Sequence, residues 1–587
     1  MPRPANRRFI SLLLCAIPLI GISIPLLPAG SAATSGWKPV SADDLSITAA
    51  GIGYPNADAA IVFRDGELDD DSPEGTVMKI YVRLKVFTER GRRYADVQLP
   101  YRMDLGKITD VHARTITPDG RAIEVEKKDV FDKLLLTSGR NVWRAKTFSM
   151  PNVGPGSMIE YRYRQVYPAG FGYFALDLQA DLFIKDLEYR VKPERSSSMD
   201  VRWVAFNSKN PDDFAPKWNG SYRITAQNIP PFRREPLMPP EAAVKVWGWL
   251  YYSKETQTDA DKYWQEYGQH MYEESMSETR PTAAIRGVVD SITLPADSVE
   301  VRIARIYNYV QREIRLVDAE IVAADHLKHN SDADQTLRRR YGTPSDINTL
   351  FAALLRAAGL DARVAELTTR DENLFHHSFP DAFQFNSEVT AVAQPDGTFK
   401  FFDPGSRYCP AGMLAWPKEG VPALVFDKES PPFVVTSITP ADRNREDHTM
   451  TVAPLPDGRV KLVAKIELTG QRAMDLRNET AMSAAEGQQA PILDDLTGGL
   501  SGAVFASPVQ FMGITDENAP VGISYECIIP ALAPPGEKRL LLRPALLGRQ
   551  NEMLFTAETR INKIYFHYPS SETDRLKIEI PEGFAAE

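Results

Sequence analysis

The sequence predicts a multidomain α+β protein with an all-β N-terminal part, a central part of mixed helices and strands, and a mostly β C-terminal part. Its 587 residues exceed what one hydrophobic core needs, because domains commonly run about 100–200 residues. Apolar residues alternate with a period of two near both ends of the chain, whereas they recur at helical spacing in the middle. A proline-rich connector over residues 229–240 separates the first two parts.

The first 33 residues have the layout of a secretory signal peptide. Arginines precede an apolar run from Phe9 to Leu27, and small residues follow at 30–33. An uncleaved membrane anchor is the alternative, but Pro18 and Pro25 interrupt the apolar run and favour cleavage. We therefore expect a mature chain that begins near Ala33 or Thr34 and lies in the periplasm or outside the cell. After cleavage, no other segment is apolar for long enough to span a bilayer.

Composition and motifs argue against several classes of function. A formal net charge of -10 and a pI near 5.5 give no electrostatic footprint for nucleic acid, and no basic stripe carries interleaved aromatic residues. No phosphate-cradling glycine loop is present, and no cofactor is expected. A histidine pair at helical spacing with nearby aspartates lacks the His-Glu-x-x-His form, so we expect no metal there: His326, His329, Asp325, Asp332 and Asp334.

Residues 34–235 are expected to form a β-sandwich-like domain. Apolar residues occur at every second position over residues 78–87, which predicts a strand with one face packed on a core. Strands over 111–117 and 121–125 flank Pro118-Asp119-Gly120, whose proline and glycine supply the turn dihedrals of a hairpin. An aromatic group just after the connector either forms a sugar-stacking platform or packs into the domain junction, which is the commoner role: Trp247, Trp249, Tyr251 and Tyr252.

Residues 236–435 are expected to form the mixed domain, and its clearest element is a helix that starts at Pro344. Thr343 is a good N-cap, and Asp346 completes a capping box. Proline suits the first helical position because its missing N–H would be unpaired there anyway. Gly359 ends the helix, whose apolar face consists of Ile347, Leu350, Phe351, Leu354, Leu355 and Ala358.

Other elements flank this helix. Ser298 caps an earlier helix with apolar residues at helical spacing from Ile303 to Ile314. After the Pro344 helix, Ala362–Leu367 is expected to be a strand, and 385–392 and 398–403 form a hairpin around a Pro-Asp-Gly turn.

Residues 436–587 are expected to form a C-terminal β-rich domain. Val460 to Leu468 alternate after an Asp-Gly turn, and a helical stretch from Arg472 to about Leu500 interrupts the strands. The chain stops at Glu587, just after the strand-like Leu576–Ile580 and earlier than we expect for such a domain, so the last domain is expected to be incomplete.

The helix after Tyr341-Gly342, the strand and the hairpin ending in Phe402-Asp403-Pro404 together resemble the papain-like core of bacterial transglutaminase-like proteins, over about residues 297–427. The preceding part looks like the uncharacterised β domain that comes before such cores in exported bacterial proteins. That likeness lies in Tyr54-Pro55-Asn56-Ala57, Ala113-Arg114-Thr115, Pro118-Asp119-Gly120 and Gly156-Ser157-Met158-Ile159-Glu160-Tyr161. The C-terminal part is similar to the β domain that often follows.

The resemblance implies where the family's catalytic residues would lie. The cysteine position falls on Pro344, the histidine position falls on Ser387, and only Asp403 matches. In such a site the helix N-terminus favours a thiolate, an imidazole takes its proton, and the aspartate orients the imidazole. Proline offers no nucleophile and serine no useful base. We therefore expect no catalytic residues here, and a binding or scaffolding protein whose ligand is a peptide, protein or glycan of the cell envelope.

Two rearranged sites are the enzymatic alternatives. Cys409 with His376 or His377 would make an amide-acting cysteine enzyme, although this cysteine lies in a loop without a helix start to lower its pKa. Ser345 with either histidine and Asp403 would make a serine hydrolase, although a serine is ordinary inside a capping box. The mature chain would retain Cys409 and Cys527, and the sequence leaves open whether they pair.

Overall fold

The computed structural model describes residues 36–585, apart from 139–140, 169–172, 195–199, 219–220, 254–258, 318–326, 486–501, 531–554 and 581. The expected signal peptide, His326 and Asp325 lie outside the described residues. Residues up to Ile47 and residues from Thr48 onward form two compact units. The first contains a short helix, α1 (Ala42–Ser46), which is capped by Ser41. Among the described helices, none is both long and apolar enough to cross a membrane.

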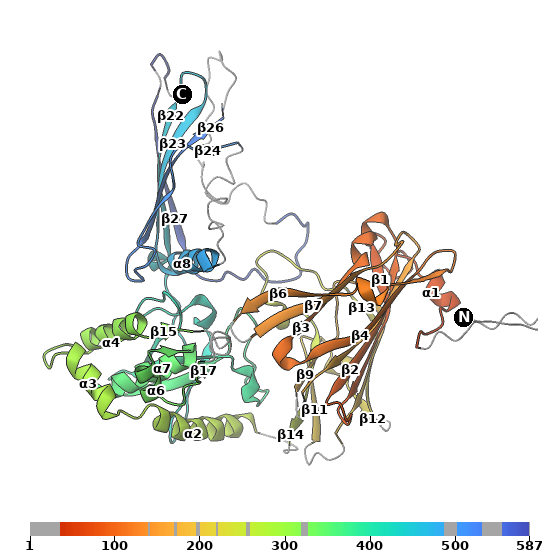
Figure 1. Cartoon of the computed structure of the whole chain (residues 1–587), viewed down its shortest axis with the longest axis horizontal. Coiled ribbons are helices and arrows are strands. Elements are labelled where there is room, and N and C mark those ends of the chain that lie inside the picture. Colours follow the sequence, from red (N-terminus) through yellow and green to blue (C-terminus); the bar gives the residue numbers. More distant parts are fainter. Residues whose placement is uncertain are drawn as a thin grey trace, which may run out of the picture. The chain divides into compact units, whose positions relative to one another are not determined.

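The N-terminal part of the second unit consists of three sheets (Figure 1). An eight-stranded sheet has the order β12-β13-β10-β1-β2-β8-β4-β5, and two three-stranded sheets have the orders β3-β7-β6 and β11-β14-β9. The strands are β1 (Ala59–Asp69), β2 (Val77–Val86), β3 (Asp96–Arg102), β4 (Lys107–Ile116), β5 (Ala122–Glu124), β6 (Phe131–Ser138), β7 (Asn141–Ser149), β8 (Met158–Val166), β9 (Tyr173–Asp177), β10 (Ile184–Lys192), β11 (Asp200–Phe206), β12 (Lys217–Trp218), β13 (Tyr222–Ile229) and β14 (Trp247–Ser253).

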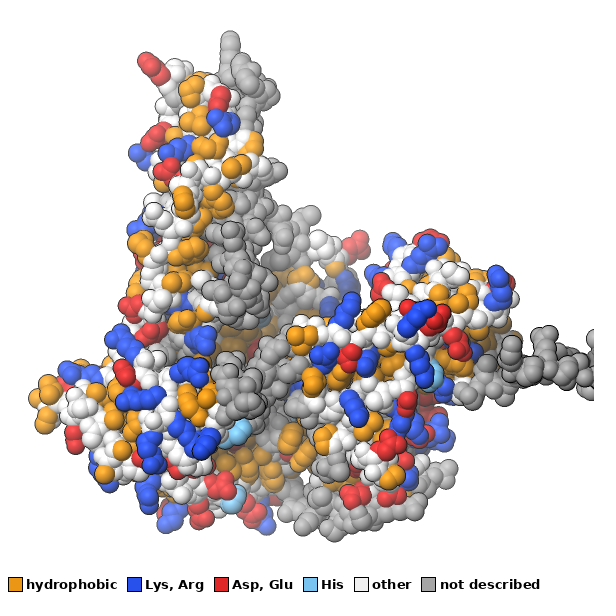
Figure 2. Space-filling model, in the orientation of Figure 1, with side chains coloured by type: hydrophobic (Ala, Val, Ile, Leu, Met, Phe, Trp, Pro, Cys, Tyr) orange, Lys and Arg blue, Asp and Glu red, His pale blue; other side chains and the backbone are white. Residues whose placement is uncertain are grey.

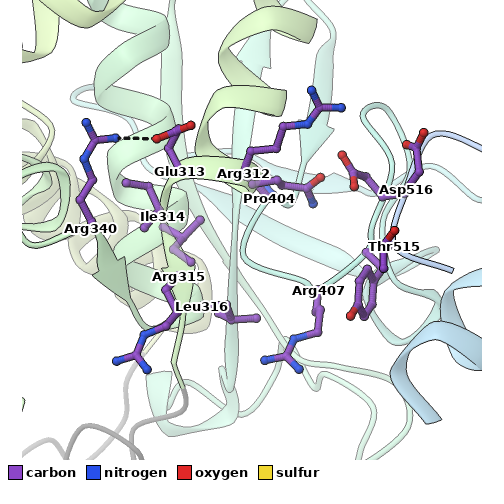
Figure 3. A pocket seen from close by; sticks show the side chains of 14 residues that line it. Arg312, Glu313, Ile314, Arg315, Leu316, Arg340, Pro404, Arg407, Thr515 and Asp516 are labelled. Atoms are coloured by element: carbon purple, nitrogen blue, oxygen red, sulfur yellow. Dashed lines mark hydrogen bonds and ion pairs between the residues drawn. The ribbon is translucent and has the colours of Figure 1, made fainter. Parts of the chain in front are cut away.

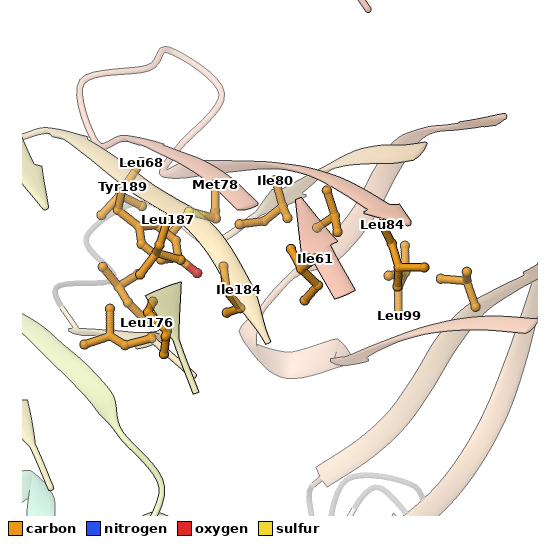
Figure 4. Close-up of a cluster of buried hydrophobic side chains, with 14 of the residues drawn as sticks. Ile61, Leu68, Met78, Ile80, Leu84, Leu99, Leu176, Ile184, Leu187 and Tyr189 are labelled. Carbon is orange, nitrogen blue, oxygen red and sulfur yellow. The ribbon is translucent and has the colours of Figure 1, made fainter. Parts of the chain in front are cut away.

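One hydrophobic cluster joins side chains from these sheets (Figure 4). Ile80 and Leu84 of β2 are buried in it together with Leu99 of β3 and Leu176 of β9. The strand expected over residues 78–87 is confirmed as β2. The expected hairpin is confirmed as the antiparallel pair β4 and β5, and Gly120 in its turn has φ +84°, a region that favours glycine.

Strand β14 carries the aromatic group and belongs to an N-terminal sheet, since it pairs with both β9 and β11. The sheet therefore extends past residue 235, where we expected the first domain to end. Trp247 stacks on Phe206 with ring centroids 4.4 Å apart, and Tyr251 meets Phe379 edge-on at 5.2 Å. Because Phe379 comes from the central part, these rings pack between two parts of the chain, as expected for a junction.

The central part places helices against a five-stranded antiparallel sheet of order β19-β18-β17-β20-β21. The strands are β17 (Ala362–Leu367), β18 (Ser387–Ala393), β19 (Phe399–Phe402), β20 (Pro422–Val425) and β21 (Phe433–Val435). The helices are α2 (Ala260–Glu278), α3 (Ala283–Ile292), α4 (Val299–Glu313), α6 (Ala333–Arg339) and α7 (Pro344–Ala357), and a small parallel pair consists of β15 (Arg315–Leu316) and β16 (Tyr341–Gly342).

Helix α7 begins and ends where its sequence predicts. The Thr343 hydroxyl accepts a hydrogen bond from the Asp346 N–H at 3.3 Å, and the Asp346 carboxylate accepts one from the Thr343 N–H at 2.9 Å. Leu350 and Leu354 are fully buried in the central core, and Gly359 follows the helix with φ +80°.

Replacing Thr343 with alanine should lower the free energy of unfolding by about 1 kcal/mol, because the cap oxygen for a helix-end N–H would be lost. Chemical denaturation measures this. Thr343→Ser keeps the hydroxyl and should be close to wild type; an unchanged midpoint and slope for Thr343→Ala would mean that the cap does not stabilise α7.

The C-terminal part has the strand order β24-β26-β23-β22-β27, and β25 also pairs with β26. Its strands are β22 (Arg445–Pro454), β23 (Val460–Leu468), β24 (Val504–Phe505), β25 (Gln510–Met512), β26 (Val521–Ile529) and β27 (Ser571–Ile578). The expected helical stretch begins as α8 (Gly470–Ala485), and its remainder lies outside the described residues. On the face drawn in Figure 2, basic and acidic side chains are interspersed.

Candidate functional site

The three positions singled out by sequence lie at the ends of neighbouring elements. Pro344 opens α7 and is exposed, Ser387 opens β18, and Asp403 directly follows β19. The loop after Asp403 packs tightly on the first turn of α7, since a Cβ added to Gly405 would lie 2.4 Å from the Pro344 carbonyl oxygen. Only glycine allows this approach.

Asp403 is fully buried and its carboxylate is fully bonded. Asn348 Nδ2 donates to Oδ1 at 3.0 Å, and the Ser406 hydroxyl donates to Oδ2 at 2.5 Å. The Lys418 ammonium binds Oδ2 at 2.7 Å, and only 9% of the lysine side chain is exposed. The lysine therefore supplies the positive charge that this carboxylate needs in order to be buried.

This ion pair changes what the aspartate can do. In the family's catalytic scheme the aspartate accepts a hydrogen bond from an imidazole and holds it toward the nucleophile. Here both oxygens of Asp403 are engaged by an amide, a hydroxyl and an ammonium. The carboxylate serves to join α7, β19 and the short helix Trp416–Lys418.

A second cluster of polar side chains lies beside the first turn of α7. The Ser345 hydroxyl donates to Glu388 Oε2 at 2.6 Å, and the Tyr267 hydroxyl donates to Glu366 Oε2 at 2.7 Å. Glu366 and Glu388 face each other across β17 and β18. Burial raises the pKa of Glu366 to about 7, although the hydrogen bond from Tyr267 opposes this, and burial also raises the pKa of Glu388.

Glu366 should make the stability of the chain fall as pH rises. Between about pH 4.5 and 7 the folded chain retains a proton on Glu366 that the unfolded chain has lost, so the free energy of unfolding decreases across this window. The shift corresponds to a loss of about 3 kcal/mol between pH 4.5 and 8, which Glu366→Gln should abolish, so that this variant is more stable than wild type at pH 8. Denaturation at pH 4.5 and 8 measures it, with the exposed Glu273→Gln on α2 as the matched control. Equal pH dependence in wild type and Glu366→Gln would contradict the assignment.

Neither rearranged site predicted as an alternative is assembled among the described residues. Cys409 is fully buried, its thiol donates to the Met413 carbonyl oxygen at 3.2 Å, and burial raises its pKa far above the ordinary range. The His376 ring packs against Phe206, whereas the Trp264 indole donates to the His377 carbonyl oxygen. Ser345 binds Glu388 instead of a histidine. Cys409 and Cys527 are both free and buried, which answers the question of their pairing.

Three side chains on the C-terminal sheet have the arrangement of a possible metal site. The potential ligand atoms of His448, Glu572 and Asp574 lie within 4.8 Å of one another. His448 Nδ1 is 2.7 Å from Asp574 Oδ1, and Nε2 is 3.1 Å from Glu446 Oε1. Burial alone would lower the pKa of His448, but its carboxylate partners outweigh burial and raise it. An imidazolium with carboxylates on both nitrogens fits this geometry better than a metal ligand does.

The sequence did not predict roles for Asn348, Glu388 and Lys418. Asn348 is a polar residue between the apolar Ile347 and Leu350 on α7, and this break in the pattern was a usable signal. Lys418 gives no such signal, because it follows an ordinary Trp-Pro step and meets Asp403 only through the fold.

Comparison with known families agrees with this arrangement. Residues 286–410 match the Transglutaminase-like superfamily, so the central domain is a transglutaminase-like core. Residues 74–233 match DUF3857, a domain of unknown function with a solved structure. The chain is therefore a multidomain α+β protein in which a DUF3857 domain precedes a transglutaminase-like core. A search among curated proteins finds no match.

Two solved structures are similar over long stretches. A proposed protease from Parabacteroides distasonis ATCC 8503 is 12% identical, with a TM-score of 0.46, over 80% of this chain and 93% of its own. A proposed cysteine protease from Cytophaga hutchinsonii is 11% identical, with a TM-score of 0.16, over 56% of this chain and 75% of its own.

Proposed function

We propose that the transglutaminase-like core is non-catalytic and serves an exported protein as a binding or scaffolding domain for a peptide, protein or glycan of the cell envelope. The observation that carries the proposal is the buried ion pair of Asp403 and Lys418. Asp403 is the one residue that matches the family's catalytic set, and its carboxylate is bonded to this lysine. Proline and serine at the other two positions supply neither a nucleophile nor an effective base. Export rests on the charged start, the apolar run and the small residues of the N-terminus.

An amide-acting enzyme that uses Cys409 is the alternative, and burial argues against it. A nucleophilic cysteine is commonly a thiolate that substrate can reach, whereas Cys409 has no exposed surface and a raised pKa. The Tyr307 hydroxyl and the Gln311 amide donate to its backbone carbonyl oxygen at 2.9 Å, and although Tyr307 also lowers the pKa of the thiol, burial outweighs this effect.

A mass-balance experiment tests the proposal. The mature protein is incubated with a defined pool of envelope peptides and cell-wall fragments, the complex is isolated by size exclusion, and the ligands are identified by mass spectrometry. We expect bound ligands to be recovered with unchanged mass. Ligands that are deamidated, cleaved or cross-linked relative to the same pool without protein would contradict a non-catalytic role.

A further inference from the structure

A cavity of about 720 Å³ adjoins the transglutaminase-like core, and Pro344, Ser387 and Asp403 are not among its described lining residues (Figure 3). Its lining includes Ile347 of α7, Pro404 after β19, and the stretch Gln311–Leu316 that leads from α4 into β15. Ligand sites for small molecules commonly have volumes of about 300–1,000 Å³, so this cavity can hold a ligand of the size of a short peptide.

One side of the cavity carries uncompensated positive charge. Arg315 and Arg407 flank Leu316, and Arg312 lies on the other side of Pro404 (Figure 3). Arg340 also lines the cavity, but its guanidinium binds Glu313 at 3.4 Å. Within the described part of the chain, the three other guanidinium groups have no carboxylate within ion-pair distance. They are therefore available to an anionic ligand.

The facing loop carries negative charge and is held in place. Among the described residues, the carboxylates of Asp516 and Glu517 accept hydrogen bonds only from Asn518, whose backbone N–H binds Asp516 at 3.1 Å and whose side-chain amide binds Glu517 at 3.2 Å. The buried Arg477 fixes this loop by donating to the carbonyl oxygens of Gly513, Asp516 and Ala519. Both residues line the cavity, and neither carboxylate has a cation within ion-pair distance among the described residues, although Arg477 attracts both from farther away.

We propose that this cavity binds a short zwitterionic peptide, with the ligand's carboxylate at Arg315 and Arg407 and its ammonium at Asp516 and Glu517. Guanidinium groups recognise carboxylates through paired hydrogen bonds, and an ammonium is satisfied by carboxylate oxygens. A purely anionic ligand would meet repulsion from the acidic loop, and a purely cationic one would meet repulsion from the arginines. The inference goes beyond the proposed function, because it holds whether or not the core retains any chemistry.

Calorimetric titration of the mature full-length protein tests the proposal with three probes. Trialanine has both charged ends, N-acetyl-trialanine lacks the ammonium, and trialanine amide lacks the carboxylate. Because a hydrogen bond to a charged group is worth about 1.5–3 kcal/mol, blocking either end should weaken binding about 10-fold or more. Equal affinity for the three probes, or no binding of trialanine at millimolar concentration, would overturn the proposal.

Two variants assign the ends of the ligand. Arg407→Gln should weaken trialanine and N-acetyl-trialanine but leave trialanine amide unchanged. Asp516→Asn should weaken trialanine and trialanine amide but leave N-acetyl-trialanine unchanged. Both side chains are exposed, and thermal unfolding checks that the variants fold. Arg286→Gln, an exposed arginine of α3 outside the cavity, is the matched control and should bind all three probes as wild type does. Loss of binding to all three probes in either variant would also contradict the assigned orientation.

Discussion

Lys418→Met should destabilise the chain by about 3–5 kcal/mol, because it leaves the buried Asp403 carboxylate without its cation. The hydrogen bonds from Asn348 and Ser406 would remain, but neither carries charge. Denaturant unfolding measures the loss. Lys428→Met, which removes an exposed lysine from the same domain, should change the stability by less than about 0.5 kcal/mol.

A double variant separates the ion pair from simple packing. Lys418→Met combined with Asp403→Asn removes both charges, so it should be less destabilised than the sum of the two single variants. Additive effects would contradict the claim that Lys418 acts through Asp403. Agreement would support the conclusion that the surviving aspartate of the catalytic set now stabilises the fold.

Glu160→Gln should destabilise the N-terminal domain by about 3–5 kcal/mol, since Glu160 is the shared carboxylate of two buried arginines. Arg83 binds Oε1 at 2.7 Å and Arg114 binds Oε2 at 2.5 Å. The three residues stand opposite one another on adjacent strands β2, β8 and β4. The Tyr81 hydroxyl also donates to Oε1 at 2.6 Å. A glutamine would keep the shape but remove the charge that both guanidinium groups bind.

Glu188→Gln is the matched control for this prediction. Glu188 also binds two arginines, Arg190 at 2.9 Å and Arg223 at 3.4 Å, but its side chain is 30% exposed. Water screens such surface pairs, so this change should cost less than about 1 kcal/mol. Equal losses for the two variants would mean that burial does not set the strength of the Glu160 network.

Local signals made part of this fold predictable from sequence. Helix α7 was predictable because Thr343, Pro344 and Asp346 act within one turn, and Gly359 ends the helix through its own backbone. The pairing of β14 with β9 and β11 was not predictable. The proline-rich connector before Trp247 suggests a domain boundary, but strand pairing depends only on free backbone groups at a sheet edge, and these can lie on either side of such a connector.

The site was predictable only where a family pattern marks it. The positions of Pro344, Ser387 and Asp403 follow from the resemblance. The partner of Asp403 does not, because Lys418 reaches it from a separate short helix and no spacing rule connects them. The same holds for the cavity, whose arginines and acidic loop are about 100–200 residues apart in the chain and meet only in the folded structure.

Turnover of the purified mature protein on amide substrates shows most directly whether the transglutaminase-like core is catalytic. Amine incorporation into glutaminyl peptides, ammonia release and peptide cleavage are measured for wild type, Pro344→Ala, Ser387→Ala and Cys409→Ala. We expect all four proteins to show no turnover above the protein-free control. Turnover that survives Pro344→Ala and Ser387→Ala but disappears in Cys409→Ala would contradict it and establish a relocated thiol site.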